Sequence, residues 1–204
     1  MQTLLFQGDS ITDVGRNREQ AFDLGKGYPM LAAAQLMFEK PEAYIVYNRG
    51  ISGDRIVDVY ARIKRDILNL RPDVLSVLIG INDVWHEIGS KNGVEAEKFE
   101  RIYDMLLEEV QRALPNIRVM LLEPFVLKGT ATIAAFETFE KETRLRAEAV
   151  RRLAEKHAAV FVPLQAAFDE KAKQTGAEIW AADGVHPTLI GHELIKREWI
   201  KAFE

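Results

Sequence analysis

The sequence contains no cysteine. This excludes disulfide bonds, thiolate catalysis and cysteine-ligated metal sites, so any nucleophile must come from another residue type. The glycine-rich patterns GxxxxGK[ST] and GxGxxG that bind phosphates do not occur either, and the GxSxG turn of ordinary α/β-hydrolases is missing. The chain therefore carries no sign of a bound nucleotide, and we expect it to work without a cofactor.

Long apolar runs and a surface of one charge sign are missing as well. No segment has the roughly 20 consecutive apolar residues of a membrane helix, and residues 1–8 lack the basic and apolar regions of a signal peptide. Lysine and arginine alternate with acidic residues, as in 144–157, so no basic stripe could neutralise a phosphate backbone. We expect a cytoplasmic protein that binds neither membranes nor nucleic acids.

The composition does supply enough apolar residues for a globular core. The 204 residues are 48% hydrophobic and 28% charged with a net charge of -4, which is typical of folded domains and not of disordered chains. This length fits one domain, and no repeat, linker or low-complexity tract divides it. We therefore expect residues 1–204 to form a single domain.

Short apolar runs alternate with longer segments of helical period. The runs are continuous, which favours strands buried on both faces of a parallel sheet. The expected strands are 3–7, 44–48, 74–79, 118–122 and 159–162. Apolar residues at helical spacing predict amphipathic crossover helices over 56–70 and 99–114, with further helices over about 28–39, 136–157 and 164–174. The alternation predicts an α/β/α three-layer sandwich.

Two further features complete the expected layout. A last helix should follow Pro187, a residue that suits a first helical position. The irregular residues 123–136 should form a long loop after the fourth strand, where they could contribute a lip beside the substrate.

Polar residues gather where the expected strands end. In a parallel α/β sheet, ligands bind beyond the carboxyl ends of the strands. The segments that follow three of these ends are 8-GDSITD-13, 48-NRGISGD-54 and 80-GIND-83. A serine beside a glycine turn after the first strand can present its hydroxyl outward and leave its own N–H free as a donor. Ser10 is therefore the candidate nucleophile.

A serine nucleophile needs a base, and the base needs a group that orients it. Asp183 and His186 supply both, with a turn at Gly184 between them. We expect the carboxylate to fold back onto one imidazole nitrogen, while the other nitrogen faces Ser10. The remaining histidines are better explained as satisfied core or loop residues; they are His86, His157 and His192.

Ester hydrolysis also needs hydrogen-bond donors aimed at the developing oxyanion. The candidates are the N–H of Ser10, the N–H of Gly53, where a side chain would obstruct close approach, and the side-chain amide of Asn82. Taken singly, Gly53 is explained by turn chemistry and Asn82 by an Asx-turn that closes a strand end. The hypothesis depends on the combination.

Three more residues are candidates for contact with the substrate: Asp9, Trp85 and Trp180. Trp85 could provide an aromatic wall for a sugar ring or acyl group, although core packing explains it equally well. Asp9 and Asp13 suggest a metal site, but so few oxygen ligands are evident that a capping or turn role explains them better, and we expect no metal. Arg16 and Arg55 either pair with the acids near the strand ends, which include Asp54 and Asp83, or face substrate; the sequence does not decide.

The four polar segments together resemble the conserved blocks of the SGNH (GDSL-type) hydrolase family. Blocks one, two, three and five are matched in order by 8-GDSITD-13, 48-NRGISGD-54, 80-GIND-83 and 183-DGVHP-187. The resemblance implies the flavodoxin-like strand order 2-1-3-4-5. It also implies the following roles: Ser10 as nucleophile, His186 as general base, Asp183 as its orienter, and Gly53 and Asn82 as oxyanion donors beside the Ser10 amide.

Within that family, the runs GDSITDVGR, IGINDVW and DGVHPTLIGH look most like intracellular acetylxylan esterases. This resemblance implies a serine esterase that removes O-acetyl groups from xylo-oligosaccharides or related carbohydrates, and a homo-oligomer. The chain departs from the pattern at Trp180, which lies three residues before Asp183. In the related esterases we expect a tryptophan immediately before that aspartate.

Two alternatives stay open. The same catalytic residues could act on longer acyl chains, as in a lysophospholipase or thioesterase. The chain could also be a noncatalytic carbohydrate-binding module that retains the fold.

Overall fold

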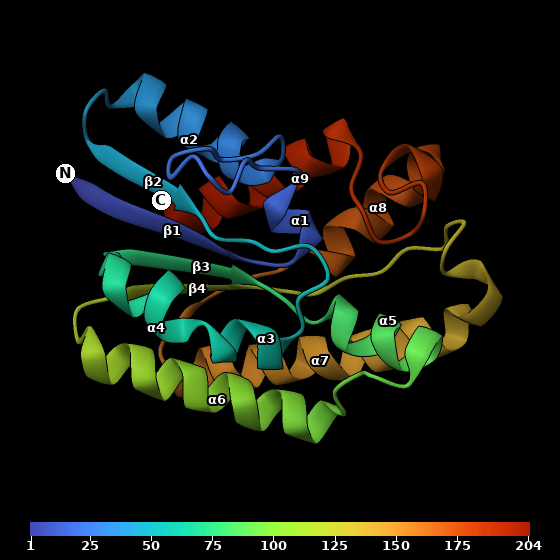
Figure 1. Cartoon of the computed structure of the whole chain (residues 1–204). Coiled ribbons are helices and arrows are strands. Elements are labelled where there is room, and N and C mark those ends of the chain that lie inside the picture. Colours follow the sequence, from blue (N-terminus) through green and yellow to red (C-terminus); the bar gives the residue numbers. More distant parts are fainter.

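The structure, a computed structural model, describes all residues from 1 to 204 and contains one five-stranded sheet (Figure 1). Its strands are β1 (Gln2–Gly8), β2 (Tyr44–Asn48), β3 (Val74–Leu78), β4 (Arg118–Leu122) and β5 (Val160–Val162). Each agrees with its expected range to within one residue at either end. All neighbouring strands are parallel and their order is β2-β1-β3-β4-β5, so the predicted flavodoxin-like topology is confirmed.

Helices connect and flank the strands. They are α1 (Ser10–Asp13), α2 (Tyr28–Glu39), α3 (Ile56–Ala61), α4 (Ile63–Asp66), α5 (Ile81–Ser90), α6 (Ala96–Ala113), α7 (Phe136–Lys156), α8 (Gln165–Thr175) and α9 (Leu189–Phe203). Three short 3-10 turns are η1 (Leu68–Leu70), η2 (Ile133–Ala135) and η3 (Ala177–Ile179). None of these helices combines the length and the apolar character needed to cross a lipid bilayer.

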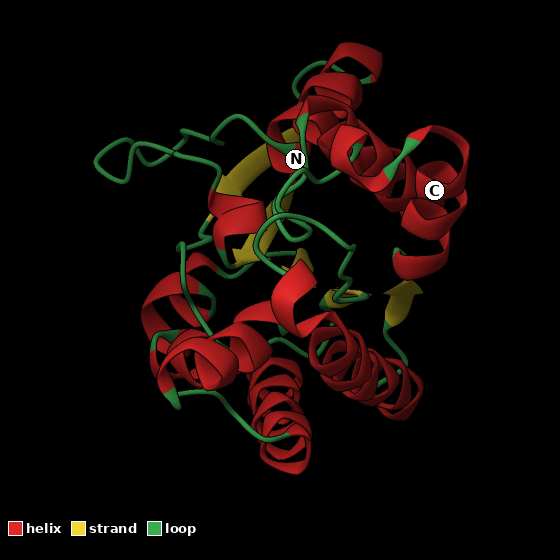
Figure 2. Cartoon of the chain, turned by 90° about the vertical axis from the view of Figure 1, so that its right-hand side faces the viewer, coloured by secondary structure: helices red, strands yellow, loops and turns green.

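The sheet is covered on both faces, which explains its continuous apolar strands. Along β1, Leu4 and Phe6 belong to the core shared with α2, α8 and α9, whereas Leu5 belongs to the core shared with α3, α4, α6 and α7. Figure 2 views the molecule from the side toward which the strand arrows of Figure 1 point, and shows the helices in two groups about the strands. The loops at this side follow the carboxyl ends of the strands.

The prediction of one continuous helix over 56–70 is wrong. The chain divides this segment into α3, α4 and η1, and the first break is at Arg62, whose ψ of 14° departs from helical geometry. The break lets the Arg62 guanidinium reach carboxylates on both sides of it, Asp54 and Asp66. The apolar face survives, because Ile56 and Ile63 are both buried.

One helix start and one whole helix also differ from expectation. Pro187 is not the first residue of the last helix, because Thr188 is the N-cap and its hydroxyl accepts a hydrogen bond from the Gly191 N–H. The helix α5 was not expected at all, although its apolar residues have helical spacing. They are Ile81, Val84, Trp85 and Ile88.

Candidate active site

Ser10, His186 and Asp183 form one continuous chain of hydrogen-bonding groups. Ser10 begins α1 directly after β1, and its Oγ lies 2.8 Å from His186 Nε2. The other ring nitrogen, Nδ1, lies 2.6 Å from Asp183 Oδ2. The His186 side chain is 44% exposed, so a substrate can approach this hydroxyl and imidazole from solvent. A hydroxyl joined in this way to an oriented base can be activated as a nucleophile.

The Asp183 carboxylate is fixed by its own turn. Asp183 Oδ1 accepts hydrogen bonds from the backbone N–H groups of Val185 at 2.8 Å and His186 at 2.7 Å, and Gly184 between them has a φ of +92° that favours glycine. Burial acts to raise the pKa of Asp183, but the hydrogen bonds from the His186 side chain and from these two amides outweigh it and lower the pKa below its ordinary value. The carboxylate therefore stays charged beside the imidazole.

The long loop after β4 supports this turn from behind. Leu127 N–H donates to Gly184 O at 2.8 Å, Thr130 N–H to Ala182 O at 3.1 Å, and Ala131 N–H to Asp183 O at 3.0 Å. The predicted loop is confirmed over residues 123–132, whereas 133–136 form η2 and the first residue of α7. The three bonds tie the loop to the backbone that carries Asp183. This part of the loop is thus a brace for the turn.

Replacement of Gly129 by alanine is expected to displace the braced turn. A Cβ at Gly129 would overlap the Gly184 amide nitrogen and the Asp183 carbonyl carbon, so one of the two backbones must move. Because small misplacements of catalytic groups are costly, we expect kcat for an aryl ester to fall by about 10- to 100-fold. Steady-state kinetics measure this, with Gly89→Ala as the matched control, since a Cβ at Gly89 meets nothing within 4 Å. Equal kcat values for the two variants would contradict the brace.

Donors for an oxyanion are available from three places. The backbone N–H groups of Ser10 and Gly53 donate to no acceptor in the structure, and Gly53 has a φ of +88°. The Asn82 side-chain nitrogen donates to Asp54 O at 3.1 Å, which places the amide against the loop that carries Gly53 and leaves its second hydrogen available. These are the groups that a developing negative charge on a carbonyl oxygen requires.

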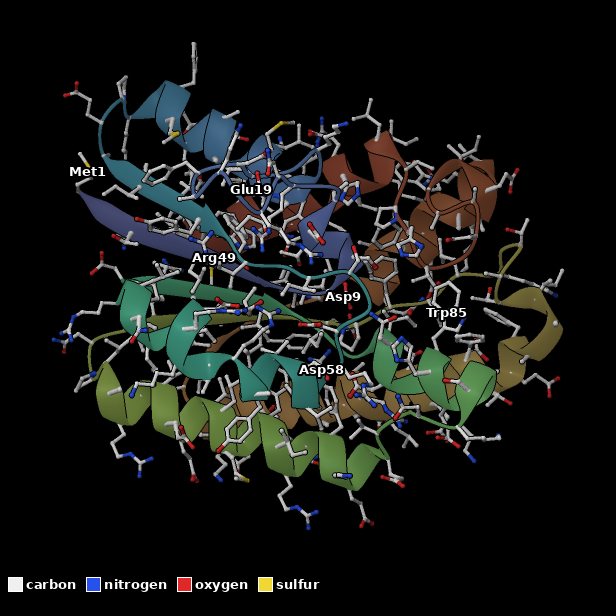
Figure 3. All side chains as sticks on the ribbon, viewed as in Figure 1. Met1, Asp9, Glu19, Arg49, Asp58 and Trp85 are labelled. Carbon is white, nitrogen blue, oxygen red and sulfur yellow. The ribbon has the colours of Figure 1, made fainter.

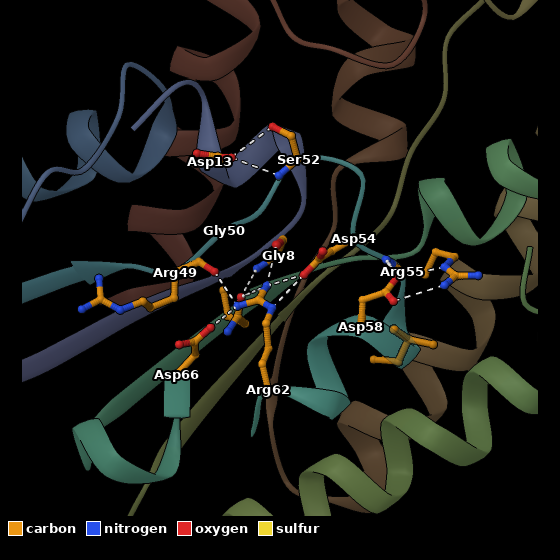
Figure 4. A network of polar contacts seen from close by, with 12 residues as sticks. Gly8, Asp13, Arg49, Gly50, Ser52, Asp54, Arg55, Asp58, Arg62 and Asp66 are labelled. Carbon is orange, nitrogen blue, oxygen red and sulfur yellow. Dashed lines mark hydrogen bonds and ion pairs between the residues drawn. The ribbon is translucent and has the colours of Figure 1, made fainter. Parts of the chain in front are cut away.

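Arg62 joins the two loops that carry these donors, and the sequence analysis did not identify it. Its guanidinium donates to Asp54 Oδ2 at 2.7 Å and to Arg49 O at 2.8 Å, the two ends of the Gly53 loop (Figure 4). It also donates to Gln7 Oε1 at 2.8 Å, in the strand that leads to Ser10. The one sequence signal was an arginine within an otherwise regular amphipathic pattern.

Asp9 directly precedes Ser10, the candidate nucleophile, and caps its helix. Its Oδ1 accepts a hydrogen bond from the Ile11 N–H at 2.9 Å, while its Oδ2 is buried without a partner. Burial raises the pKa of Asp9 to about 7, although the Ile11 hydrogen bond and His186 act against this rise. Asp9 therefore has the capping role that the sequence favoured. Because only 1% of its surface is exposed, it offers almost no surface to a substrate.

The raised pKa of Asp9 predicts a pH-dependent stability. The folded protein retains a proton that the unfolded chain loses above about pH 4, so this group makes the free energy of unfolding fall as pH rises from about 4 to about 7. The slope from one such group is at most about 1.4 kcal/mol per pH unit. Asn at position 9 can still cap the helix and does not titrate.

We therefore expect the stability of Asp9→Asn relative to the natural protein to increase across this pH window and to level off above it. Urea unfolding at pH values from 4 to 9 measures the difference. Asp169→Asn, on α8, is the control. A difference for Asp9→Asn that does not change with pH would contradict the buried, protonated carboxyl.

The two tryptophans have different surroundings. Trp85 on α5 is half-buried, with its ring centroid 5.8 Å from that of His186 and 6.1 Å from that of Phe139, so it forms a wall beside the imidazole. In Figure 3, Asp9 and Trp85 lie toward the same side of the molecule, where β1 ends. The Trp180 indole N–H instead donates to Thr175 Oγ1 at 2.8 Å, and no aromatic or hydrogen-bond contact links its side chain to His186. Contact of Trp180 with substrate stays a prediction.

A parallel sheet of this order, with a hydroxyl, an imidazole and a carboxylate in series at its carboxyl edge, defines a hydrolase of the serine–histidine–aspartate type. The chain belongs to the GDSL-like Lipase/Acylhydrolase (SGNH) family, whose model matches residues 6–194. The predicted family is confirmed, and the protein is a hydrolase with the fold and family of esterases.

Relatives with solved structures or known activities agree with this assignment. An acetylxylan esterase from Geobacillus stearothermophilus is 34% identical over 98% of this chain and 93% of its own length. The crystal structure of Axe2, an acetylxylan esterase from that organism, superposes with a TM-score of 0.87 and covers 98% of this chain and 93% of the other. A Parabacteroides merdae protein assigned to the GDSL-like lipases is 37% identical, with a TM-score of 0.94 and coverages of 98% and 94%.

Proposed function

We propose that the protein is a carbohydrate O-acetyl esterase that works through an acyl-enzyme. The observation that carries the proposal is the Ser10–His186–Asp183 chain, with contacts of 2.8 Å and 2.6 Å, beside unpartnered backbone donors. These groups can activate a weakly nucleophilic hydroxyl and stabilise the negative charge that its attack creates on the carbonyl oxygen.

The geometry supports a two-step reaction. Ser10 Oγ attacks the ester carbonyl carbon while its proton passes to His186 Nε2, and the resulting imidazolium is stabilised by Asp183. The oxyanion accepts hydrogen bonds from the N–H groups of Ser10 and Gly53 and from the Asn82 amide. Collapse breaks the C–O bond, and His186 returns the proton to the alcohol that leaves. Water then attacks the acyl-enzyme with His186 as base, which releases the acid and restores Ser10.

The choice of an acetylated carbohydrate is supported by the relatives and by the surroundings of His186. Axe2 is described as an acetyl-xylooligosaccharide esterase, and its catalytic mutants replace a serine in one structure and an aspartate in another. In this chain, the face of Trp85 beside His186 is a surface on which a sugar ring can stack. Trp85 is therefore proposed as a substrate contact.

Acetate release from acetylated xylo-oligosaccharides tests the substrate assignment. We expect one acetate to be released for each acetyl ester bond that is cleaved. With a series of aryl esters, we expect kcat/KM to be highest for the acetyl ester and to fall as the acyl chain lengthens. A maximum at long chains, with no acetate from the sugar, would favour the lysophospholipase or thioesterase alternative. No labelling by a serine-directed organophosphate and no burst of product would favour the noncatalytic module.

Three further properties that the sequence analysis expects are also part of this proposal. They are a single domain over residues 1–204, a cytoplasmic location, and association into a homo-oligomer.

A further inference from the structure

A hollow in the surface lies beside the loops after β1 and β2 and has an arginine-rich lining. Its volume is about 540 Å³, within the range of small-molecule sites. The charged residues that line it are Arg16, Arg18, Arg49, Arg65, Glu19 and Asp66. None of the residues assigned above to the triad or the oxyanion donors lines it. Figure 3 shows Arg49 and Glu19 on the opposite side of Asp9 from Trp85.

Arg16 is a buried cation in this lining whose hydrogen-bonding capacity is mostly unused. Its side chain is 5% exposed, and only its Nε donates to the protein, to Gly50 O at 3.1 Å. The nearest carboxylate oxygen, Asp13 Oδ1, is 3.9 Å from Nε, and the other Asp13 oxygen already accepts from Arg18 at 2.8 Å. The two terminal nitrogens of Arg16 therefore have no hydrogen-bond acceptor in the protein, and its ion pair with Asp13, at 3.9 Å, is longer than a charge-assisted hydrogen bond.

The charges around Arg16 do not supply the missing acceptor. Asp66 is paired with Arg62 and Arg65, each at 2.7 Å. Arg49 donates only to carbonyl oxygens, those of Ala21 and Asn48, and forms no ion pair. Burial lowers the pKa of Arg16, Asp13 opposes this, and the positive charges of Arg49 and Arg18 reinforce it. The hollow is thus positive, with two guanidinium groups available.

We propose that this hollow is a binding site for an oxyanion, a carboxylate or phosphate group, held by the guanidinium groups of Arg16 and Arg49. Planar guanidinium groups bind both kinds of anion through paired N–H donors, and a buried one binds more strongly because it is shielded from water. The anion belongs either to an acidic substituent of the substrate or to a separate small metabolite. The hollow borders the loop that carries the proposed oxyanion donor Gly53, because Arg16 bonds to Gly50 of that loop and Ile51 of the same loop lines the hollow.

Calorimetric titration of the full chain with inorganic phosphate and with D-glucuronate tests the site directly. We expect saturable binding of either anion, no binding of neutral D-xylose, and at least tenfold weaker binding in Arg16→Gln and in Arg49→Gln. The control Arg144→Gln, with its arginine 68% exposed on α7, should bind as the natural protein does. No saturable binding, or unchanged affinity in both variants, would overturn the proposal; Arg49→Gln decides if Arg16→Gln does not fold.

Kinetics then separate the two sources of the anion. If it is part of the substrate, acetylated xylo-oligosaccharides that carry a glucuronate group should have a lower KM than neutral ones, and Arg16→Lys should remove this advantage. If it is a separate metabolite, the two substrates should have equal KM values, and phosphate should alter the hydrolysis of both. Because the titrations need no turnover, their failure would leave the esterase proposal intact.

Discussion

Ser10→Ala is expected to lower kcat for acetyl esters by about 10⁴- to 10⁶-fold. The substitution removes the one hydroxyl that lies within hydrogen-bond distance of His186 Nε2, at 2.8 Å, so no acyl-enzyme can form. The proposed oxyanion donors are backbone and amide groups that the substitution leaves in place, which predicts a small residual rate above that of water. Ser10 lies at the start of α1 and is not its cap, so the fold should be preserved.

Single-turnover and steady-state assays with an aryl acetate measure this loss. The matched control is Ser90→Ala, since Ser90 is an exposed serine at the end of α5 that bonds only to a backbone carbonyl. The control should retain full activity, and both variants should show the circular dichroism of the natural protein. Retained turnover in folded Ser10→Ala would remove Ser10 from its role as nucleophile.

Asp183→Asn is expected to lower kcat by about 10⁴-fold with little change in KM. The carboxylate accepts a hydrogen bond from His186 Nδ1–H, which keeps the lone pair of Nε2 directed at the Ser10 hydroxyl. An asparagine amide can donate to Nδ1 instead, which would place the ring proton on Nε2, where it cannot accept the serine proton. The asparagine oxygen can still accept from the backbone amides of Val185 and His186, so the turn should keep its shape.

The same aryl acetate assay, run across a pH series, measures this effect. Asp169→Asn, a carboxylate on α8 that accepts from Gln165, is the control and should leave kcat unchanged. A loss of less than tenfold in Asp183→Asn would show that the imidazole is oriented by other contacts, such as the neighbouring Trp85 ring.

Much of the fold could be predicted because its signals are local. A strand buried on both faces must be apolar throughout, and each such run of the sequence became a strand to within one residue at either end. Helix boundaries were less predictable where a side chain overrode the local pattern. Arg62 interrupts an apolar period that is regular on both sides of it. Its guanidinium pairs with the Asp54 carboxylate and donates to Gln7 Oε1, and Gln7 lies 55 positions away in the sequence. Thr188 displaced Pro187 as the start of α9 through a single capping bond.

The sequence by itself determined the residue types of the candidate site and the loops that carry them. Ser10 follows a strand end, and the Asp183–His186 spacing lets one carboxylate reach one imidazole within a single turn. These features depend on contacts a few residues apart, so their pattern can be read along the chain.

Only the tertiary structure decided the 2.8 Å approach of Ser10 to His186 and the hydrogen bonds by which the loop after β4 supports the Asp183 turn. It also decided the bonds by which Arg62 joins the Gly53 loop to β1, and left the terminal nitrogens of Arg16 without a hydrogen-bond acceptor. Each joins segments that are distant in the sequence. Their geometry depends on how the sheet and its two helical layers pack, and no local spacing specifies that packing.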